Sequence, residues 1–361
     1  MTRLSNNFLM MIAAILLGLI GGIAGMIIIG SSDFKVPLLG RVNFANDNYN
    51  KQQIIIQQPR NVVVEQDTQL KQIENNLFPT LISVYQTKKG TDPLAKAYLP
   101  SELLGQGFVL TADGWVVVPA SAISNTKGKY TAVAYQKKLY DLTGFIEDEK
   151  LGLTFARVSA NNLPVVTLGK SNELILGQTV VLVASGDDIS IAHIKKIGYE
   201  FKDNKELIEN SDSIRKTIYL DLPDNQLKSG AIVVNLKGEI VGMVSGKDIV
   251  MSDYLNNVIK YVLNGQKISR PVLGINYIDL AQADGLIRVA DKGALVYGAL
   301  DKNSPATGKI LEGDIIRKVN DTELNVFKGL AEAVSGHKTG DKIELTVWRG
   351  GKEISQNIIL K

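Results

Sequence analysis

The chain has 361 residues, of which 40 are Lys or Arg and 37 are Asp or Glu, leaving a formal net charge of +3. At roughly 150 residues per domain, this length predicts two folded units with additional segments. A hydrophobic fraction of 45% and the near balance of charge exclude a disordered polar chain and a polycation built for nucleic acid. We therefore expect no nucleic-acid partner.

Cysteine is absent, which excludes disulfides, a thiolate nucleophile and a thiolate zinc site. The two histidines, His193 and His337, are too few for a multi-histidine metal site. The sequence also contains no phosphate-cradling glycine loop. We therefore expect neither a metal nor another cofactor.

The first apolar segment runs for 22 residues from Phe8 to Ile29 without a charged residue. As a helix it would reach about 33 Å, which is enough to cross a bilayer. A cleaved signal peptide is the alternative, but its apolar core would be shorter and no A-x-A site precedes Ser31. We expect residues 8–29 to be a retained anchor, with residues 1–7 in the cytoplasm and the bulk of the chain outside the cytoplasmic membrane.

Residues 30–67 are expected to form a linker, because nine of the nineteen positions from Asn43 to Asn61 are Asn or Gln. Residues 68–251 then carry short apolar runs separated by turn residues, which predicts an all-β barrel or sandwich. The strand-like runs are residues 81–86, 105–111, 114–120, 130–136, 153–158, 178–185, 217–222, 230–236 and 239–246.

After the β region the pattern changes to a helix, with Ser252 as its expected N-cap and Gly265 at its end. Residues 252–269 are therefore expected to be a linker helix. Residues 270–361 form a smaller unit in which strand-like runs flank a helical stretch near residues 327–334. We expect a second domain of mixed strand and helix there.

Several short motifs follow one another in a recognisable order. They are Gly105–Phe108, Asp113–Trp115, Asn162–Pro164, Leu168–Gly169, Leu176–Gln178, Val234–Gly242, Gly265–Arg270 and Leu273–Ile275. Over about residues 70–361 the chain resembles the HtrA/Deg family of serine proteases. The resemblance implies an all-β trypsin-like double β-barrel plus a small α/β PDZ domain, preceded by one transmembrane helix.

The positions that match the family's catalytic triad carry other residues. The resemblance places Ser121 at the histidine position and Gly152 at the aspartate position. Ser229 keeps the nucleophile position, while Leu227 replaces a glycine whose amide helps to form the oxyanion hole. A serine hydroxyl needs an adjacent base at neutral pH, and losing that base costs on the order of 10⁶ in kcat. We therefore expect Ser229 to be inactive.

Four other groups are candidates for a replacement base or a ligand. His193 is interpreted as an exposed or half-buried strand residue, and Lys228 as a solvated lysine that is a poor base. Glu147–Glu149 is interpreted as a solvated turn, and His337 as a surface residue. None of the four restores a triad.

The second unit resembles a peptide-binding module. Backbone amides around Gly274 would hold the terminal carboxylate of a peptide, and the strand of residues 275–278 would offer its edge for β-augmentation. The alternative is that the same apolar residues serve only as core. The candidate peptide-binding residues are Val272, Leu273, Gly274, Ile275, Tyr277, Phe327, Leu330 and Val334.

Two functions remain open at this point. The first is a membrane-anchored pseudoprotease that binds peptides or the carboxyl termini of unfolded proteins, as a scaffold, holdase or regulator in extracytoplasmic protein quality control. The second is an active HtrA-like serine endopeptidase that uses Ser229 with a non-standard base. The resemblance also implies a possible homotrimer, formed around residues 68–85.

Overall fold

The computed structural model describes residue 10 and residues 13–22, 34–36, 40–42, 60–184, 188–286, 292–326 and 328–361. The chain divides into two compact units, Met1–Val64 and Glu65–Lys361. In the first unit, β1 (Phe34–Val36) pairs antiparallel with β2 (Gly40–Val42).

The expected anchor lies only partly within the described residues. Residues 13–22 are helical, and of the rest of the span 8–29 only Met10 is described. Within the described part of the chain, no helix has both the length and the apolarity that crossing a bilayer requires.

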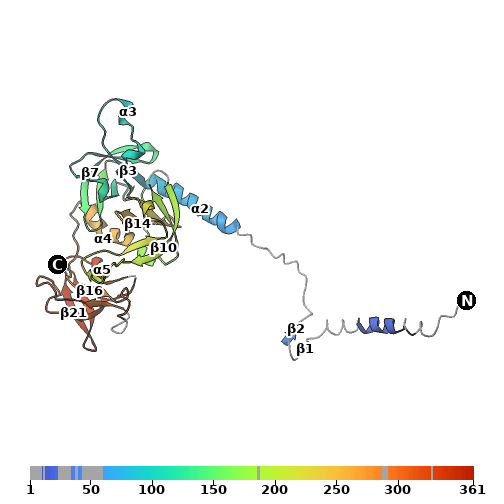
Figure 1. Ribbon diagram of the computed structural model, residues 1–361. Coiled ribbons are helices and arrows are strands. Elements are labelled where there is room, and N and C mark those ends of the chain that lie inside the picture. The colour runs from blue at the N-terminus through green and yellow to red at the C-terminus, as the bar shows by residue number, and fades with distance from the viewer. Residues whose placement is uncertain are drawn as a thin grey trace. The chain divides into compact units, whose positions relative to one another are not determined.

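Helix α2 (Arg60–Leu77) begins earlier than the sequence pattern suggested, so the expected linker of residues 30–67 ends in helix. The helix has a reason to form, because Ile73 and Leu77 are buried in the core of the second unit. Figure 1 shows α2 leading into the folded part of the chain.

Six antiparallel strands form a closed barrel in the order β3-β4-β5-β8-β7-β6. Gly107 on β4 lets two strands approach closely, because a Cβ there would lie 2.2 Å from the Val117 carbonyl oxygen. The strands are β3 (Leu81–Gln86), β4 (Gly105–Val109), β5 (Trp115–Pro119), β6 (Tyr130–Ala134), β7 (Leu139–Asp148) and β8 (Leu153–Val158). Short helical turns in this region are η1 (Phe78–Thr80), α3 (Pro93–Lys96), η2 (Pro100–Glu102), η3 (Ala120–Ala122) and η4 (Tyr135–Lys137).

A second sheet has the order β12-β10-β9-β13-β14-β15. One side chain joins its two ends: Thr217 Oγ1 accepts a hydrogen bond from the Ile249 amide at 2.7 Å and donates to the Ile249 carbonyl at 3.0 Å. The strands are β9 (Thr179–Ala184), β10 (Asp188–Gly198), β12 (Thr217–Leu220), β13 (Ile232–Asn235), β14 (Ile240–Ser245) and β15 (Asp248–Met251). The turns η5 (Ser171–Glu173) and η6 (Asp224–Gln226) precede β9 and β13.

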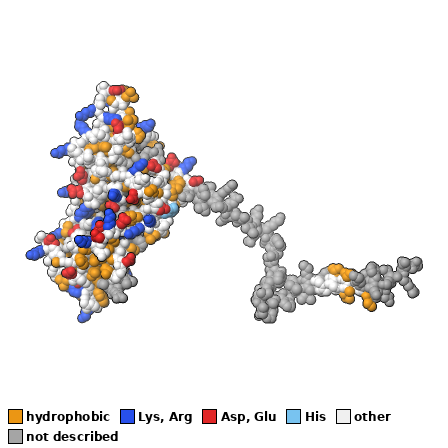
Figure 2. All heavy atoms as spheres, in the orientation of Figure 1, with side chains coloured by type: hydrophobic (Ala, Val, Ile, Leu, Met, Phe, Trp, Pro, Cys, Tyr) orange, Lys and Arg blue, Asp and Glu red, His pale blue; other side chains and the backbone are white. Residues whose placement is uncertain are grey.

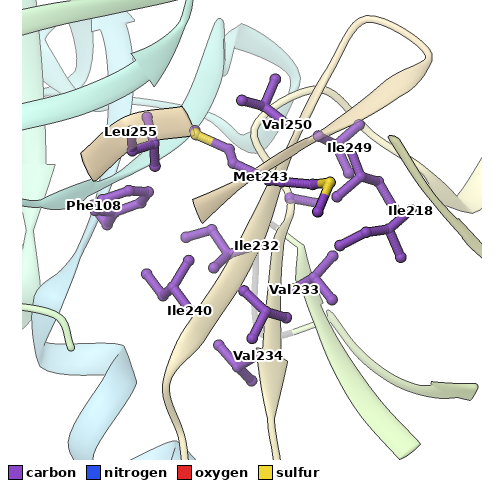
Figure 3. Packing of buried hydrophobic residues seen from close by; sticks show 14 of the residues in the cluster. Phe108, Ile218, Ile232, Val233, Val234, Ile240, Met243, Ile249, Val250 and Leu255 are labelled. Atoms are coloured by element: carbon purple, nitrogen blue, oxygen red, sulfur yellow. The ribbon is translucent and has the colours of Figure 1, made fainter. Parts of the chain in front are cut away.

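The apolar core is shared by both barrels. Phe108 from the first barrel, Met243 from the second and Leu255 from α4 belong to one buried cluster. Figure 3 shows these side chains meeting those of β13 and β14, including Ile232 and Ile240. Burial of these apolar side chains holds the barrels together without any contribution from catalytic groups.

Helix α4 (Ser252–Leu263) follows β15 as the sequence predicted, but its N-cap differs. Met251 occupies the N-cap position, and Ser252 is the first helical residue. The Ser252 hydroxyl donates to the Gly169 carbonyl at 2.7 Å, so it ties the helix to the second barrel instead of capping it.

The C-terminal domain contains a sheet in the order β11-β16-β17-β18-β20-β21, with β19 paired to β18. Its first strand, β11 (Ile208–Asn210), comes from the region expected to belong to the barrels. The other elements are β16 (Asn276–Asp279), β17 (Ala294–Val296), β18 (Ile315–Val319), β19 (Thr322–Glu323), α5 (Leu330–Ser335), β20 (Lys342–Arg349) and β21 (Lys352–Ile359). On the face shown in Figure 2, acidic and basic side chains are interspersed.

The Thr217 bridge can be tested by replacing the hydroxyl with a methyl group. We expect Thr217→Val to lower the free energy of unfolding by about 1–3 kcal/mol, because both Ile249 backbone groups lose a buried partner. Thr143→Val is the matched control, since its hydroxyl is exposed and water can replace its bond to the Arg157 carbonyl. Urea denaturation of the full chain measures both, and equal stabilities would contradict the bridge.

Candidate catalytic cleft and peptide groove

The nucleophile position lies in a turn between the two barrels. Ser229 follows η6 and precedes β13, and its side chain faces Ser121 in η3 at the end of β5. The two Oγ atoms are 3.0 Å apart, a hydrogen bond in which either hydroxyl can be the donor. The fold thus brings together two residues separated by 108 positions, and the contact joins one alcohol to another.

The third position, Gly152, lies just before β8 with φ of +62°. Its carbonyl accepts hydrogen bonds from the Ser245 hydroxyl at 2.7 Å and from the Ala120 amide at 2.8 Å. A Cβ on Gly152 would lie 2.6 Å from Ser245 Oγ. A side chain here would therefore need a left-handed backbone conformation and a shift of the Ser245 hydroxyl.

Backbone amides of the turn around Ser229 form hydrogen bonds within the turn itself. Leu227 N–H donates to the Asp224 carbonyl at 3.1 Å, and Lys228 N–H donates to the Gln226 carbonyl at 2.9 Å. Leu227 has φ of −80°, a backbone angle that a branched residue adopts without strain. Its amide is instead consumed within the turn, where it cannot hold an oxyanion.

Glycine is required at position 230, directly after Ser229, because the first barrel lies in contact there. Gly230 has φ of +91°, and a Cβ there would lie 2.4 Å from the Gln106 carbonyl oxygen. Its amide donates to the Val244 carbonyl at 2.8 Å. The turn is thus held against both barrels by backbone contacts that do not depend on catalytic side chains.

The expected carboxylate loop, residues 272–275, is occupied by a side chain of the same chain. Asp212 Oδ1 accepts hydrogen bonds from the Leu273 amide at 2.8 Å and from the Gly274 amide at 3.1 Å. Asp212 Oδ2 also accepts from Gly274, at 3.2 Å. Gly274 has φ of +68°, and a Cβ there would lie 2.8 Å from the Ser304 Cβ, so the loop requires glycine.

The strand edge next to this loop is paired as well. Strand β11 runs antiparallel to β16, with Glu209 opposite Tyr277 and Asn210 opposite Asn276. The pairing continues through Ser211, whose amide donates to the Ile275 carbonyl at 2.9 Å. Residues 208–212, hereafter the groove segment, therefore cover the edge that the sequence analysis assigned to an extended peptide.

Most of the expected pocket residues form the core of the C-terminal domain. Leu273, Ile275, Tyr277, Leu330 and Val334 are at most 1% exposed and share one apolar cluster. Val272 stands apart at 37% exposure, and Phe327 lies outside the described residues. Strand β16 and helix α5 thus contribute these residues to one core beside the groove segment.

Comparison with protein-family models matches residues 103–243 to a trypsin-like peptidase domain and residues 271–360 to a PDZ domain. The "Probable periplasmic serine endoprotease DegP-like" of Pseudomonas putida (strain GB-1) is 28% identical over 274 residues, covering 72% of this chain and 56% of that protein. These matches support a relationship to HtrA/Deg family proteases. The chain spans about half the length of the DegP-like relatives it matches.

Further similarities support the same fold. "Serine protease Do-like HtrA" of Lactococcus lactis subsp. cremoris (strain MG1363) is 26% identical over 241 residues, 59% of each protein. The solved structure "HtrA-type protease AlgW with decapeptide" has a TM-score of 0.53 and 18% identity, covering 80% of this chain and 97% of that one. The expected trypsin-like double barrel with a PDZ domain is confirmed.

The side chains weighed as alternative bases have other partners. Lys228 Nζ lies 3.4 Å from Asp188, and the two groups are exposed. Asp148 is buried and ion-paired with Arg270, which corrects its interpretation as part of a solvated turn. His337 lies between the Ala333 carbonyl, 3.0 Å from its Nδ1, and Asn320, 2.9 Å from its Nε2.

His193 forms a pair that the sequence analysis missed. Its Nδ1 lies 2.8 Å from Asp221 Oδ2, and its amide donates to Asp221 Oδ1 at 2.6 Å. The hydrogen bonds from the His193 amide and ring lower the pKa of Asp221. Both groups are half exposed, His193 on β10 and Asp221 directly after β12. His193 lies five residues, or about 16 Å, along β10 from Asp188, which is ion-paired with Lys228, the neighbour of Ser229.

A buried polar cluster joins the second barrel to the PDZ domain. The Lys216 side chain is fully buried, and its Nζ lies 3.4 Å from Glu332 of α5. Glu332 also accepts hydrogen bonds from the hydroxyls of Tyr254 at 3.0 Å and Tyr199 at 3.4 Å. This cluster therefore joins the second barrel to α5 through hydrogen bonds and an ion pair, which are more directional than apolar contacts.

Two buried carboxyl groups near this cluster each have an oxygen without a hydrogen-bond partner among the described residues. Burial raises the pKa of Glu209 to about 7, with Arg215 acting in the opposite direction. Burial also raises the pKa of Asp279 to about 6, opposed by Lys216. Glu209 Oε1 and Asp279 Oδ2 are buried without a hydrogen-bond partner among the described residues, although Arg215 lies 3.4 Å from the former.

These shifts predict that stability falls as the pH rises. A raised pKa means that the folded chain favours protonated Glu209 and Asp279, so the penalty is absent at low pH and complete above about pH 7. We expect the full chain to lose stability to urea from about pH 5 to about pH 8, less steeply when Glu209→Gln and Asp279→Asn are combined. Equal slopes for the wild type and this double variant would contradict the prediction, and Glu149→Gln, at an exposed position, is the control.

Proposed function

We propose that this chain is a membrane-anchored HtrA-like pseudoprotease. It binds peptides or protein carboxyl termini through its PDZ domain, as a scaffold, holdase or regulator in extracytoplasmic protein quality control. The observation that carries the proposal is the 3.0 Å contact between the hydroxyls of Ser229 and Ser121. A serine hydroxyl does not accept the proton that a nucleophilic serine must lose at neutral pH.

The rest of the cleft supports the same reading. Gly152 supplies a carbonyl in place of the carboxylate that would orient an imidazole, and the Leu227 amide is bonded to Asp224. General base, orienting group and oxyanion donor are therefore all replaced, and each contributes separately to such catalysis. The barrels keep their packing, since their core residues do not belong to the cleft.

The location and assembly in this proposal have their own support. Two of the relatives are named periplasmic proteases, which favours an extracytoplasmic position for residues 30–361. The uncharged run at residues 8–29 supplies the anchor, with the N-terminus in the cytoplasm. A homotrimer built around residues 68–85 would add avidity for ligands with several binding segments.

The test is labelling by a fluorophosphonate together with turnover of unfolded casein by the full chain. We expect no labelling and no turnover above the rate of the Ser229→Ala variant, with an active trypsin-like protease assayed as the positive control. Labelling that disappears in Ser229→Ala would show that the serine is activated and would overturn the pseudoprotease proposal.

Restoring one catalytic group is a sharper version of the same test. Ser121→His would put an imidazole beside Ser229, but we expect no recovery, because Gly152 cannot orient the ring and the Leu227 amide is engaged. Activity in Ser121→His above that of Ser121→Asn, a variant without a base, would show that the rest of the catalytic machinery is intact.

A further inference from the structure

The groove segment enters the PDZ domain in the direction that a peptide carboxyl terminus takes. An extended peptide that adds to a PDZ strand supplies main-chain hydrogen bonds along the strand, and its carboxylate is captured by backbone amides. Residues 208–210 pair antiparallel with β16, and Ser211 and Asp212 continue toward the carboxylate loop. Ser211 stands at the last position of such a peptide, and Glu209 stands two positions earlier.

A side chain takes the place of a chain terminus at the end of this segment. The chain turns away directly after the groove, because the Asp212 amide donates to Asn210 Oδ1 at 2.9 Å and the Ser213 amide donates to the Asn210 carbonyl at 3.0 Å. This turn leaves the Asp212 carboxylate against the amides of Leu273 and Gly274. The Ser211 hydroxyl also binds here, accepting from the Ile275 amide at 3.0 Å and donating to Asp212 at 2.9 Å.

We propose that the groove segment is an internal ligand of the PDZ domain, with the Asp212 side chain acting as the terminal carboxylate, and that outside peptides with a free carboxyl terminus bind by displacing it. The inference rests on the proposed peptide-binding function and names its regulation. The displacing peptide has the chemistry that the groove segment imitates: a free carboxylate and an extended backbone.

One residue of the groove segment weakens the internal ligand. Glu209 faces Tyr277 and has a side chain only 1% exposed, with one oxygen that lacks a hydrogen-bond partner. An ionised group in such a place is unfavourable unless it is fully paired. A peptide with an uncharged side chain two positions before its end would make the same backbone contacts without that penalty, so we expect it to compete best.

Displacement would also affect the adjoining cleft. A cavity of about 710 Å³ is lined by Asn210 and Asp212 of the groove segment and by Gly152 and Ser245 near the catalytic positions. The Lys150 side chain donates to the Asp212 carbonyl at 2.6 Å across this cavity. Removing the groove segment from the PDZ domain therefore changes one wall of this cavity.

The test uses peptides taken from the chain itself. The first probe is a fluorescent heptapeptide with the sequence of residues 205–211, KELIENS, ending in a free carboxylate, and the second replaces its Glu209 equivalent by Gln. We expect Asp212→Asn in the full chain to bind both at least about tenfold more tightly than the wild type, because the groove is no longer held by a charged competitor. The Gln peptide should bind more tightly than the Glu peptide, and a carboxyl-amidated peptide should not bind.

Matched variants keep the test specific. Asp203→Asn changes the same charge in the exposed part of the same loop and should leave the affinity unchanged. The chain contains no cysteine, so Asn210→Cys with Asn276→Cys creates one pair across β11 and β16, where the two native amide side chains already lie 2.8 Å apart. Oxidation of this pair should abolish peptide binding, and reduction should restore it.

The outcomes separate the inference from the function on which it rests. Tighter binding by Asp212→Asn together with loss of binding in the oxidised cysteine pair supports both. Equal affinity in the wild type, Asp212→Asn and the oxidised pair overturns the internal ligand and leaves peptide binding in place. No binding of either free-carboxylate peptide by any form, Asp212→Asn included, overturns both.

Discussion

The contact on which this structure depends is that of the Asp212 carboxylate with the amides of Leu273 and Gly274. Buried backbone amides must be bonded, and a PDZ carboxylate loop has several that point to one place. By filling the loop with its own side chain, the chain satisfies these amides and fixes the PDZ domain to the second barrel. The β11–β16 pairing and the buried Lys216–Glu332 ion pair join the same two parts of the chain.

The barrel fold around Ser229 does not depend on catalytic side chains. Ser229 and Ser121 still meet across the two barrels, because backbone contacts at Gly230 and an apolar core position the turn. Changing the triad positions leaves those contacts intact, since none of them uses a catalytic side chain. The loop after β10 also carries the groove segment, which pairs with β16 of the PDZ domain.

The apolar alternation and the turn residues were enough to predict most of the buried strands, although β15 was missed, and the family resemblance predicted that Ser121 lies near Ser229. Strand β7 (Leu139–Asp148) was missed because half of its ten residues are exposed and its register shifts between Thr143 and Ile146, which breaks the alternation. Asp212 was missed for a different reason. Its role comes from a turn and from pairing with residues some sixty positions away, and the local sequence, Ile208 to Asp212, shows only a short strand-like run followed by Ser and Asp.

Amide hydrogen exchange at Leu273 and Gly274 in the full chain without added peptide tests this account most directly. Both amides donate to Asp212, so their protection reports whether the groove segment is in place. The account predicts exchange at least about a hundredfold slower than in an unstructured peptide, and loss of that protection in Asp212→Ala. Exchange at the unstructured rate in the wild type would show an open groove and would contradict the account.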